Sequence, residues 1–207
     1  MSRLTVLMLL CALPGVAIAQ EASPPVEPAP LTDPTAHRHL GFYFHVDLGG
    51  GYLSTSASQS GSTASAKGAS ALLSVAAGGA VAEDWILAGE IWGAAAPSPS
   101  GVTSSDATIA LSGFGLNVTH YFMPANVFLT LTPSATVLSV DNGSGTAGRT
   151  QIGFGGRLAI GKEWWVGDHW GLGVAAQGYF GINRDQGTDA PTWSTFGGGI
   201  LFSATYN

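Results

Sequence analysis

Hydrophobic residues recur at every second position along most of the chain after residue 40. This period is typical of β-strands whose two faces meet different surroundings. It predicts eight strands, at residues 41–53, 69–82, 85–95, 107–122, 127–140, 150–165, 170–183 and 192–206. Alanines in the second segment also favour a helix, but Gly78 and Gly79 in its middle argue for a strand. Pro133 removes a backbone donor from the fifth strand, so we expect a local distortion there.

The connections between these strands alternate between long and short. Polar, loop-like segments occupy residues 54–68, 95–106, 141–149 and 184–191, whereas the turns near residues 83–84, 124–126 and 167–169 are tight. A soluble meander has no reason to make every second loop long. A membrane barrel does, because one rim faces the periplasm and the other faces the outside. The pattern therefore predicts an all-β fold, an eight-stranded antiparallel up-and-down transmembrane β-barrel.

Aromatic residues gather beside the tight turns and the chain end that shares their rim. Amphipathic rings are typical of a membrane–water boundary. We therefore predict an interface girdle made of Phe42, Tyr43, Trp85, Tyr121, Phe122, Trp164, Trp165, Trp170 and Tyr206. The alternative, a soluble aromatic core, does not explain why the rings collect at every second turn.

The first 19 residues have the features of a secretory signal peptide. Arg3 supplies the positive charge, residues 4–13 form the apolar segment, and Ala17-Ile18-Ala19 forms the cleavage site. A lipoprotein signal that leaves Cys11 as the first mature residue is the weaker alternative, because bulky residues precede this cysteine and the apolar stretch continues past it. The prolines of residues 20–40 predict an extended periplasmic linker, and residues 41–207 then form the barrel.

Composition narrows the function classes further. Loss of Cys11 with the signal leaves a mature chain without thiol chemistry or disulfides. Removing Arg3 leaves six of the seven Lys and Arg residues against thirteen Asp and Glu, which argues against nucleic-acid binding. Charged residues make up 10% of the chain, below the roughly 25% of soluble domains.

With its signal, strand count, loop alternation and aromatic rim, the chain resembles the small eight-stranded outer-membrane barrels of the OmpA/OmpX type. The resemblance covers about residues 41–207. Its segment 161–173 is similar to a hairpin of uncharacterised outer-membrane barrels. The resemblance implies location in the outer membrane, contact with its lipid, a monomeric state and insertion by the barrel-assembly machinery. Such barrels often end in an aromatic residue, whereas here Tyr206 is penultimate.

An eight-stranded barrel is just wide enough for side chains to fill its interior. The alternation places a polar cluster in the lumen, consisting of Asp47, Glu90, Arg157, Gln151, Asn117, Gln177 and Tyr179. Because charges inside a membrane protein need partners, we predict that Arg157 pairs with Glu90 or Asp47. The cluster is interpreted as a structural ion pair rather than a gate or selectivity filter.

Catalytic and cofactor chemistry finds little support in the sequence. The five histidines are His37, His39, His45, His120 and His169, and none lies in a long loop beside a nucleophile. His45 and Asp47 share a face, which favours a lumen hydrogen bond. The two linker histidines are expected to be exposed, and the Gly-rich runs lack the helix that nucleotide binding requires. We therefore predict no catalytic residue, no metal and no cofactor.

The predicted function is that of an integral outer-membrane barrel with a plugged lumen and a structural or surface-interaction role. Its long Ser/Thr/Gly-rich loops would contact any extracellular ligand. A narrow, porin-like passive channel is the alternative. A soluble periplasmic barrel with an apolar ligand inside is the third interpretation, and it would require the apolar faces to point inward.

Overall fold

A computed structural model describes residues 37–59, 62–143 and 147–207 of the 207-residue chain. The predicted signal peptide and most of the predicted linker lie outside the described residues. The strands are β1 (Phe42–Gln59), β2 (Ser62–Ala82), β3 (Trp85–Pro97), β4 (Thr108–Phe122), β5 (Val127–Asp141), β6 (Ala147–Arg149), β7 (Gly153–Trp165), β8 (Trp170–Arg184) and β9 (Thr192–Tyr206). Within these described ranges, no helix has the length and apolar character needed to cross a membrane.

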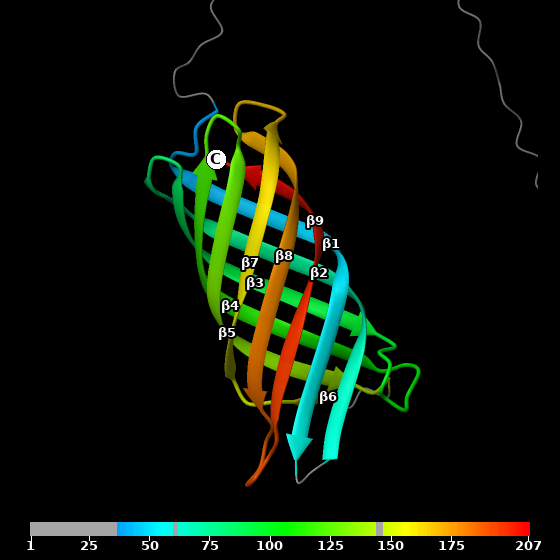
Figure 1. Cartoon of the computed structure of the whole chain (residues 1–207). Coiled ribbons are helices and arrows are strands. Elements are labelled where there is room, and N and C mark those ends of the chain that lie inside the picture. Colours follow the sequence, from blue (N-terminus) through cyan, green and yellow to red (C-terminus); the bar gives the residue numbers. More distant parts are fainter. Residues whose placement is uncertain (1–36, 60–61, 144–146) are drawn as a thin grey trace, which may run out of the picture. The chain divides into compact units, whose positions relative to one another are not determined.

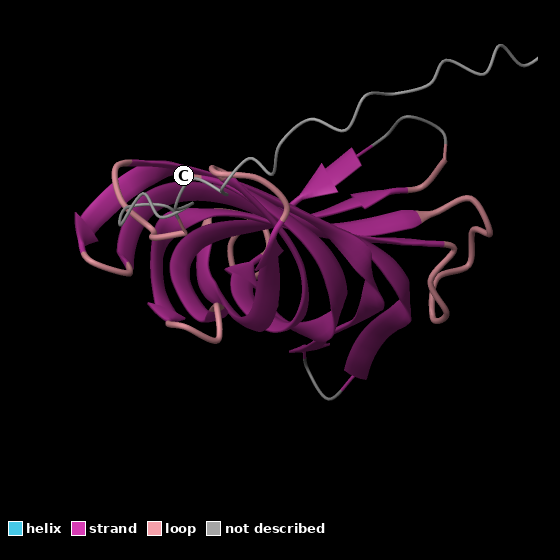
Figure 2. Ribbon diagram, turned by 90° about the horizontal axis from the view of Figure 1, so that it is seen from above, coloured by secondary structure: helices cyan, strands magenta, loops and turns pink. Residues whose placement is uncertain are grey.

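The sheet closes on itself. Neighbouring strands pair antiparallel in the order β4-β3-β2-β1-β9-β8-β7-β5, and a further β4–β5 pairing completes the ring. Among the described strands, the three-residue β6 pairs only with the end of β5. It therefore lengthens the sheet there but is not one of the eight strands that form the closed ring. Figure 1 shows the tilted strands, and Figure 2 shows them curling into a ring. The predicted all-β, eight-stranded antiparallel barrel is confirmed.

Strand boundaries differ from the prediction mainly at one hairpin. Residues 54–68 were expected to form a long loop, but β1 continues to Gln59 and β2 begins at Ser62. Inward-facing Thr55, Ala57 and Ala66 are buried, which explains why the strands persist beyond the apolar residues. The predicted sixth strand likewise starts at Gly153, not at residue 150.

The two faces of the wall have different compositions. On β1 the outward side chains are apolar from Phe42 to Tyr52 and are serines beyond Tyr52. This span matches the about 9–11 residues of a tilted transmembrane strand. On β7 and β9, Leu158 is 52% exposed and Phe202 is 55% exposed. We call this outward ring of hydrophobic side chains the apolar belt, and it contradicts the inverted faces of a soluble ligand-binding barrel.

Two local predictions are also confirmed. The alanine-rich second segment is a strand throughout residues 69–82. The β4–β5 ladder pairs Gly115 with Ser134 and then Val118 with Leu131, so regular pairing is interrupted beside Pro133. The lost proline donor accounts for this interruption.

Candidate functional site

A buried polar network crosses the middle of the barrel. Each of the eight wall strands contributes to it, through Asp47 (β1), Ser74 (β2), Glu90 (β3), Asn117 (β4), Thr132 (β5), Arg157 (β7), Gln177 (β8) and Thr205 (β9), with His45 as a second member from β1. Strand alternation places these side chains inside because each shares the inward face of its strand. We call this set the polar network.

Arg157 is the centre of the polar network. Its guanidinium forms ion pairs with Asp47 through Nη2 and with Glu90 through Nη1. Nη1 also donates to Ser74 Oγ at 3.0 Å, and Nε donates to Gln177 Oε1 at 2.6 Å. The exposed fraction of Arg157 is 2%, and both carboxylates are fully buried. One planar donor group on β7 therefore binds side chains from four other strands.

Neutral donors complete the shell of Glu90. Asn117 Nδ2 donates to Glu90 Oε2 at 2.8 Å, and Thr132 Oγ1 donates to the same oxygen at 2.5 Å. Thr119 Oγ1 donates in turn to Asn117 Oδ1 at 2.8 Å. Burial of a carboxylate is tolerated when its oxygens have charged and hydrogen-bonding partners. Both kinds of partner surround Glu90.

His45 has a hydroxyl on one side and a carboxylate on the other. Its Nδ1 lies 2.7 Å from Thr205 Oγ1, and its Nε2 lies 3.0 Å from Asp47 Oδ1. Thr205 Oγ1 donates to Glu163 Oε1 at 2.6 Å. Because a hydroxyl has one proton to donate, Nδ1 must be the donor toward Thr205. The imidazole therefore does not act as a base on this hydroxyl.

Large side chains fill the barrel on both sides of the polar network. Toward the tight turns lie buried Tyr43, Tyr121 and Phe128, with ring centroids 5.7 Å apart for the last two. Toward the long loops, the Trp92 and Tyr179 rings also lie 5.7 Å apart, and Trp92 Nε1 donates to Ser134 Oγ at 2.9 Å. Aromatic rings therefore lie in the interior on both sides of the polar network.

His39 closes the end of the barrel at the tight turns. It is completely buried, its ring stacks on Tyr121 with centroids 3.4 Å apart, and its Nε2 lies 2.8 Å from Asn126 Oδ1. Beside it, Arg38 forms a 2.8 Å ion pair with Glu83. The expectation of an exposed, idle linker histidine is wrong, because residues just before β1 fold into the barrel mouth.

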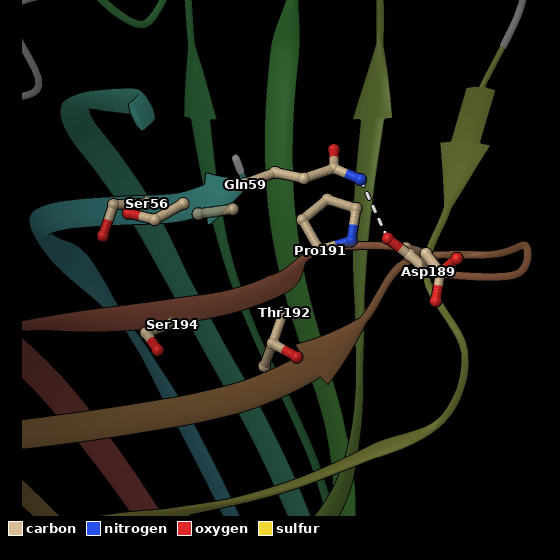
Figure 3. A pocket seen from close by; sticks show the side chains of 9 residues that line it. Ser56, Gln59, Asp189, Pro191, Thr192 and Ser194 are labelled. Atoms are coloured by element: carbon tan, nitrogen blue, oxygen red, sulfur yellow. Dashed lines mark hydrogen bonds between the residues drawn. The ribbon is translucent and has the colours of Figure 1, made fainter. Parts of the chain in front are cut away.

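At the opposite end, a polar hollow of about 570 Å³ opens between the tip of β1 and the β8–β9 loop (Figure 3). Ser56, Thr192 and Ser194 line it on the outer wall. Gln59 reaches across Pro191, and its Nε2 donates to the carbonyl oxygen of Asp189 at 2.8 Å. The loop is thereby tied to the hairpin and forms a small, hydroxyl-rich surface.

Four predicted site residues, namely Gln151, Tyr43, Tyr121 and Trp165, lie elsewhere than expected. Gln151 is exposed outside the lumen, where its Nε2 donates to the carbonyl oxygen of Asp185 at 3.2 Å. It precedes β7, so strand alternation does not apply to it. Tyr43 and Tyr121 point into the barrel, with exposed fractions of 1% each, instead of joining the girdle. Both share the parity of inward residues on their strands, and this signal could have placed them correctly.

The remaining predicted girdle residues stay near the tight turns. Phe42, Trp85, Phe122, Trp164 and Trp170 are exposed on the outer wall. The half-buried Tyr206 packs edge-on against Trp170, with ring centroids 5.2 Å apart.

Trp165 turns toward the barrel mouth, where its ring lies 5.1 Å from that of His39.

Within the parts of the chain that the structure describes, no three His, Cys, Asp or Glu side chains form a cluster able to hold a metal ion.

Comparison with known proteins shows the fold but not a function. No model of a known family matches the sequence, and no curated protein is a detectable relative. Neisserial surface protein A is 16% identical over 80% of this chain and 96% of its own, with a TM-score of 0.54. Outer membrane protein AlkL is 12% identical over 90% and 96%, with a TM-score of 0.46. Outer membrane protease OmpT from Escherichia coli is 7% identical over 80% and 96%, with a TM-score of 0.44. With its closed ring and apolar belt, the chain is an eight-stranded β-barrel of the outer-membrane type.

Proposed function

We propose that the protein is a closed outer-membrane barrel whose role is structural or surface-interacting rather than conductive. The polar network carries this proposal. Arg157 lies across the middle of the lumen between Asp47 and Glu90, and packed aromatic rings lie on both sides of this layer. Because an eight-stranded barrel has little interior space beyond its side chains, this arrangement supports a blocked lumen.

The outward-facing parts of the molecule support the orientation that we propose. The tight turns and the aromatic girdle would face the periplasm, and the long connections would face outside. The polar hollow beside Asp189 would then belong to the exposed recognition surface. We further propose that outer-membrane lipid contacts the belt, and that the assembly machinery reads the last strand through Tyr206.

We also infer that the barrel is not an enzyme. The hydroxyl, imidazole and carboxylate of Thr205, His45 and Asp47 follow one another in the order of a nucleophile–base–carboxylate triad, although the hydroxyl donates to Glu163 and not to the imidazole. However, their exposed fractions are 0%, 3% and 0%, so a substrate has no access to them. Lipase and protease assays on the folded protein in micelles should show no turnover. Robust turnover that is lost in His45→Ala would overturn this inference.

Planar-bilayer recording tests the closed lumen directly. Purified, folded protein should insert without giving stable unitary currents. Arg157→Ala serves as the diagnostic variant because it removes the guanidinium at the centre of the network. Stable currents from the unmodified protein, with a conductance that changes in Arg157→Ala, would show that the protein is a narrow channel.

A further inference from the structure

We propose that the long-loop end of the barrel contains a binding site for one small, uncharged apolar molecule of about the size of benzene. The site is a cavity of about 160 Å³, separate from the polar network. Its lining includes Ala66 of β2, Val102 of the β3–β4 connection, Ile109 of β4, Leu138 and Val140 of β5, and Trp193 of β9.

The surroundings of the cavity are apolar. Ala66, Ile109 and Leu138 have exposed fractions of 5%, 2% and 2%, and Val102 and Trp193 pack against the same core. Thr55 also lines the cavity, but its hydroxyl already has a partner, Thr195 Oγ1 at 2.8 Å. A buried water needs two to four polar partners to be held. The cavity therefore favours a carbon skeleton over water.

The volume sets the size of the ligand. An engineered protein cavity of about 150 Å³ with an aliphatic and aromatic lining stays dry and binds benzene. The cavity here has nearly the same volume, and aliphatic and aromatic side chains make up most of its lining beside the hydroxyl groups of Thr55 and Ser65. No charged side chain is among its lining residues, so the ligand class is neutral and without strong hydrogen-bonding groups.

The β3–β4 connection fixes one wall of this cavity. Backbone hydrogen bonds join Lys67 and Ser100 in both directions, at 3.1 and 2.8 Å. These bonds hold the connection beside β2, and Gly101 makes a close approach to the Ser65 carbonyl that a side chain would prevent. Val102 is thereby held against the barrel core. The exposed Ala64 and Ser65 also line the cavity, so it reaches the surface beside them.

Benzene titration of methyl-labelled protein in lipid nanodiscs tests the proposal. We expect saturable shifts of the Ile109, Leu138 and Val102 methyl signals in NMR spectra. Ala66→Leu fills the cavity and should abolish the saturable shifts. The matched control is Ala71→Leu on the same strand, where the side chain is exposed to the lipid side, and it should leave them unchanged.

Benzene also partitions into lipid, so methyl groups of the belt such as Leu158 report the background. Val102→Phe is a second variant that fills the cavity. It changes the β3–β4 connection and not a barrel strand, so it replaces Ala66→Leu in the test if Ala66→Leu does not fold. The proposal is overturned if the cavity methyls show no shift. It is equally overturned if their shifts rise linearly with the Leu158 shift, or if they persist unchanged in a folded filling variant.

Discussion

Replacement of Arg157 by methionine should destabilise the barrel strongly. The change keeps much of the apolar stem but removes the guanidinium that pairs with Asp47 and Glu90 and donates to Ser74 and Gln177. Both carboxylates then stay buried without their main cation. Breaking a buried ion pair by removal of one partner lowers the free energy of unfolding by about 3–5 kcal/mol. We expect a loss in this range, because two pairs are broken at once while His45 still faces Asp47.

Urea titration of the protein folded into lipid vesicles, followed by tryptophan fluorescence, measures this loss. Arg184→Met at the exposed end of β8 is the matched control, and it should change stability by about 0–1 kcal/mol. The triple variant Arg157→Met, Asp47→Asn and Glu90→Gln removes all three charges, so it should recover most of the lost stability. A loss below about 1 kcal/mol for Arg157→Met alone, or no recovery in the triple variant, would refute the reasoning from charge.

Three further changes test other parts of the barrel. His39→Ala removes the ring that stacks on Tyr121, and it should speed proteolysis of the segment before β1 while the barrel itself stays folded; unchanged cleavage would count against a sealed mouth. Gly49→Ala puts a methyl group into a carbonyl oxygen of β9 and should lower stability by about 1–3 kcal/mol, whereas Gly50→Ala has space and should be nearly neutral; equal urea midpoints would be contrary to this close approach. Leu158→Arg places a charge on the belt and should lower the unfolding free energy in vesicles by about 2–4 kcal/mol, with Leu158→Ala as the milder control; a smaller loss for Arg than for Ala would mean that this face does not meet hydrocarbon.

Period-two alternation explains why the barrel could be predicted from the sequence. A strand that separates hydrocarbon from a packed lumen must alternate side-chain character, so Phe202 and Ser203 already define opposite faces. The same parity places Asp47, Glu90 and Arg157 inside without any knowledge of contacts. Trp92 shares the parity of Glu90, so its inward position could also have been recognised.

The alternation of residues does not predict strands or side-chain directions where the two faces of a strand no longer meet different surroundings. Beyond Leu53 both faces of the first hairpin carry mainly small polar residues and alanines, so the composition resembles that of a loop although β1 continues to Gln59. Gln151 has the parity of Arg157 but precedes the strand. His39 follows a proline-rich segment, and its burial depends on Tyr121 and Asn126, which are distant in the sequence. Only the folded ring brings these partners together.

Every strand of the ring contributes a side chain to the polar network. The network therefore disfavours barrels in which one strand is paired out of register. A shift of one residue in the pairing register of any strand would exchange its inward and outward side chains. On β1 such a slip would turn Asp47 toward hydrocarbon, and on β7 it would withdraw Arg157 from both carboxylates. The ion pairs and hydrogen bonds of the polar network therefore all form only when the eight strands of the ring are in their native register.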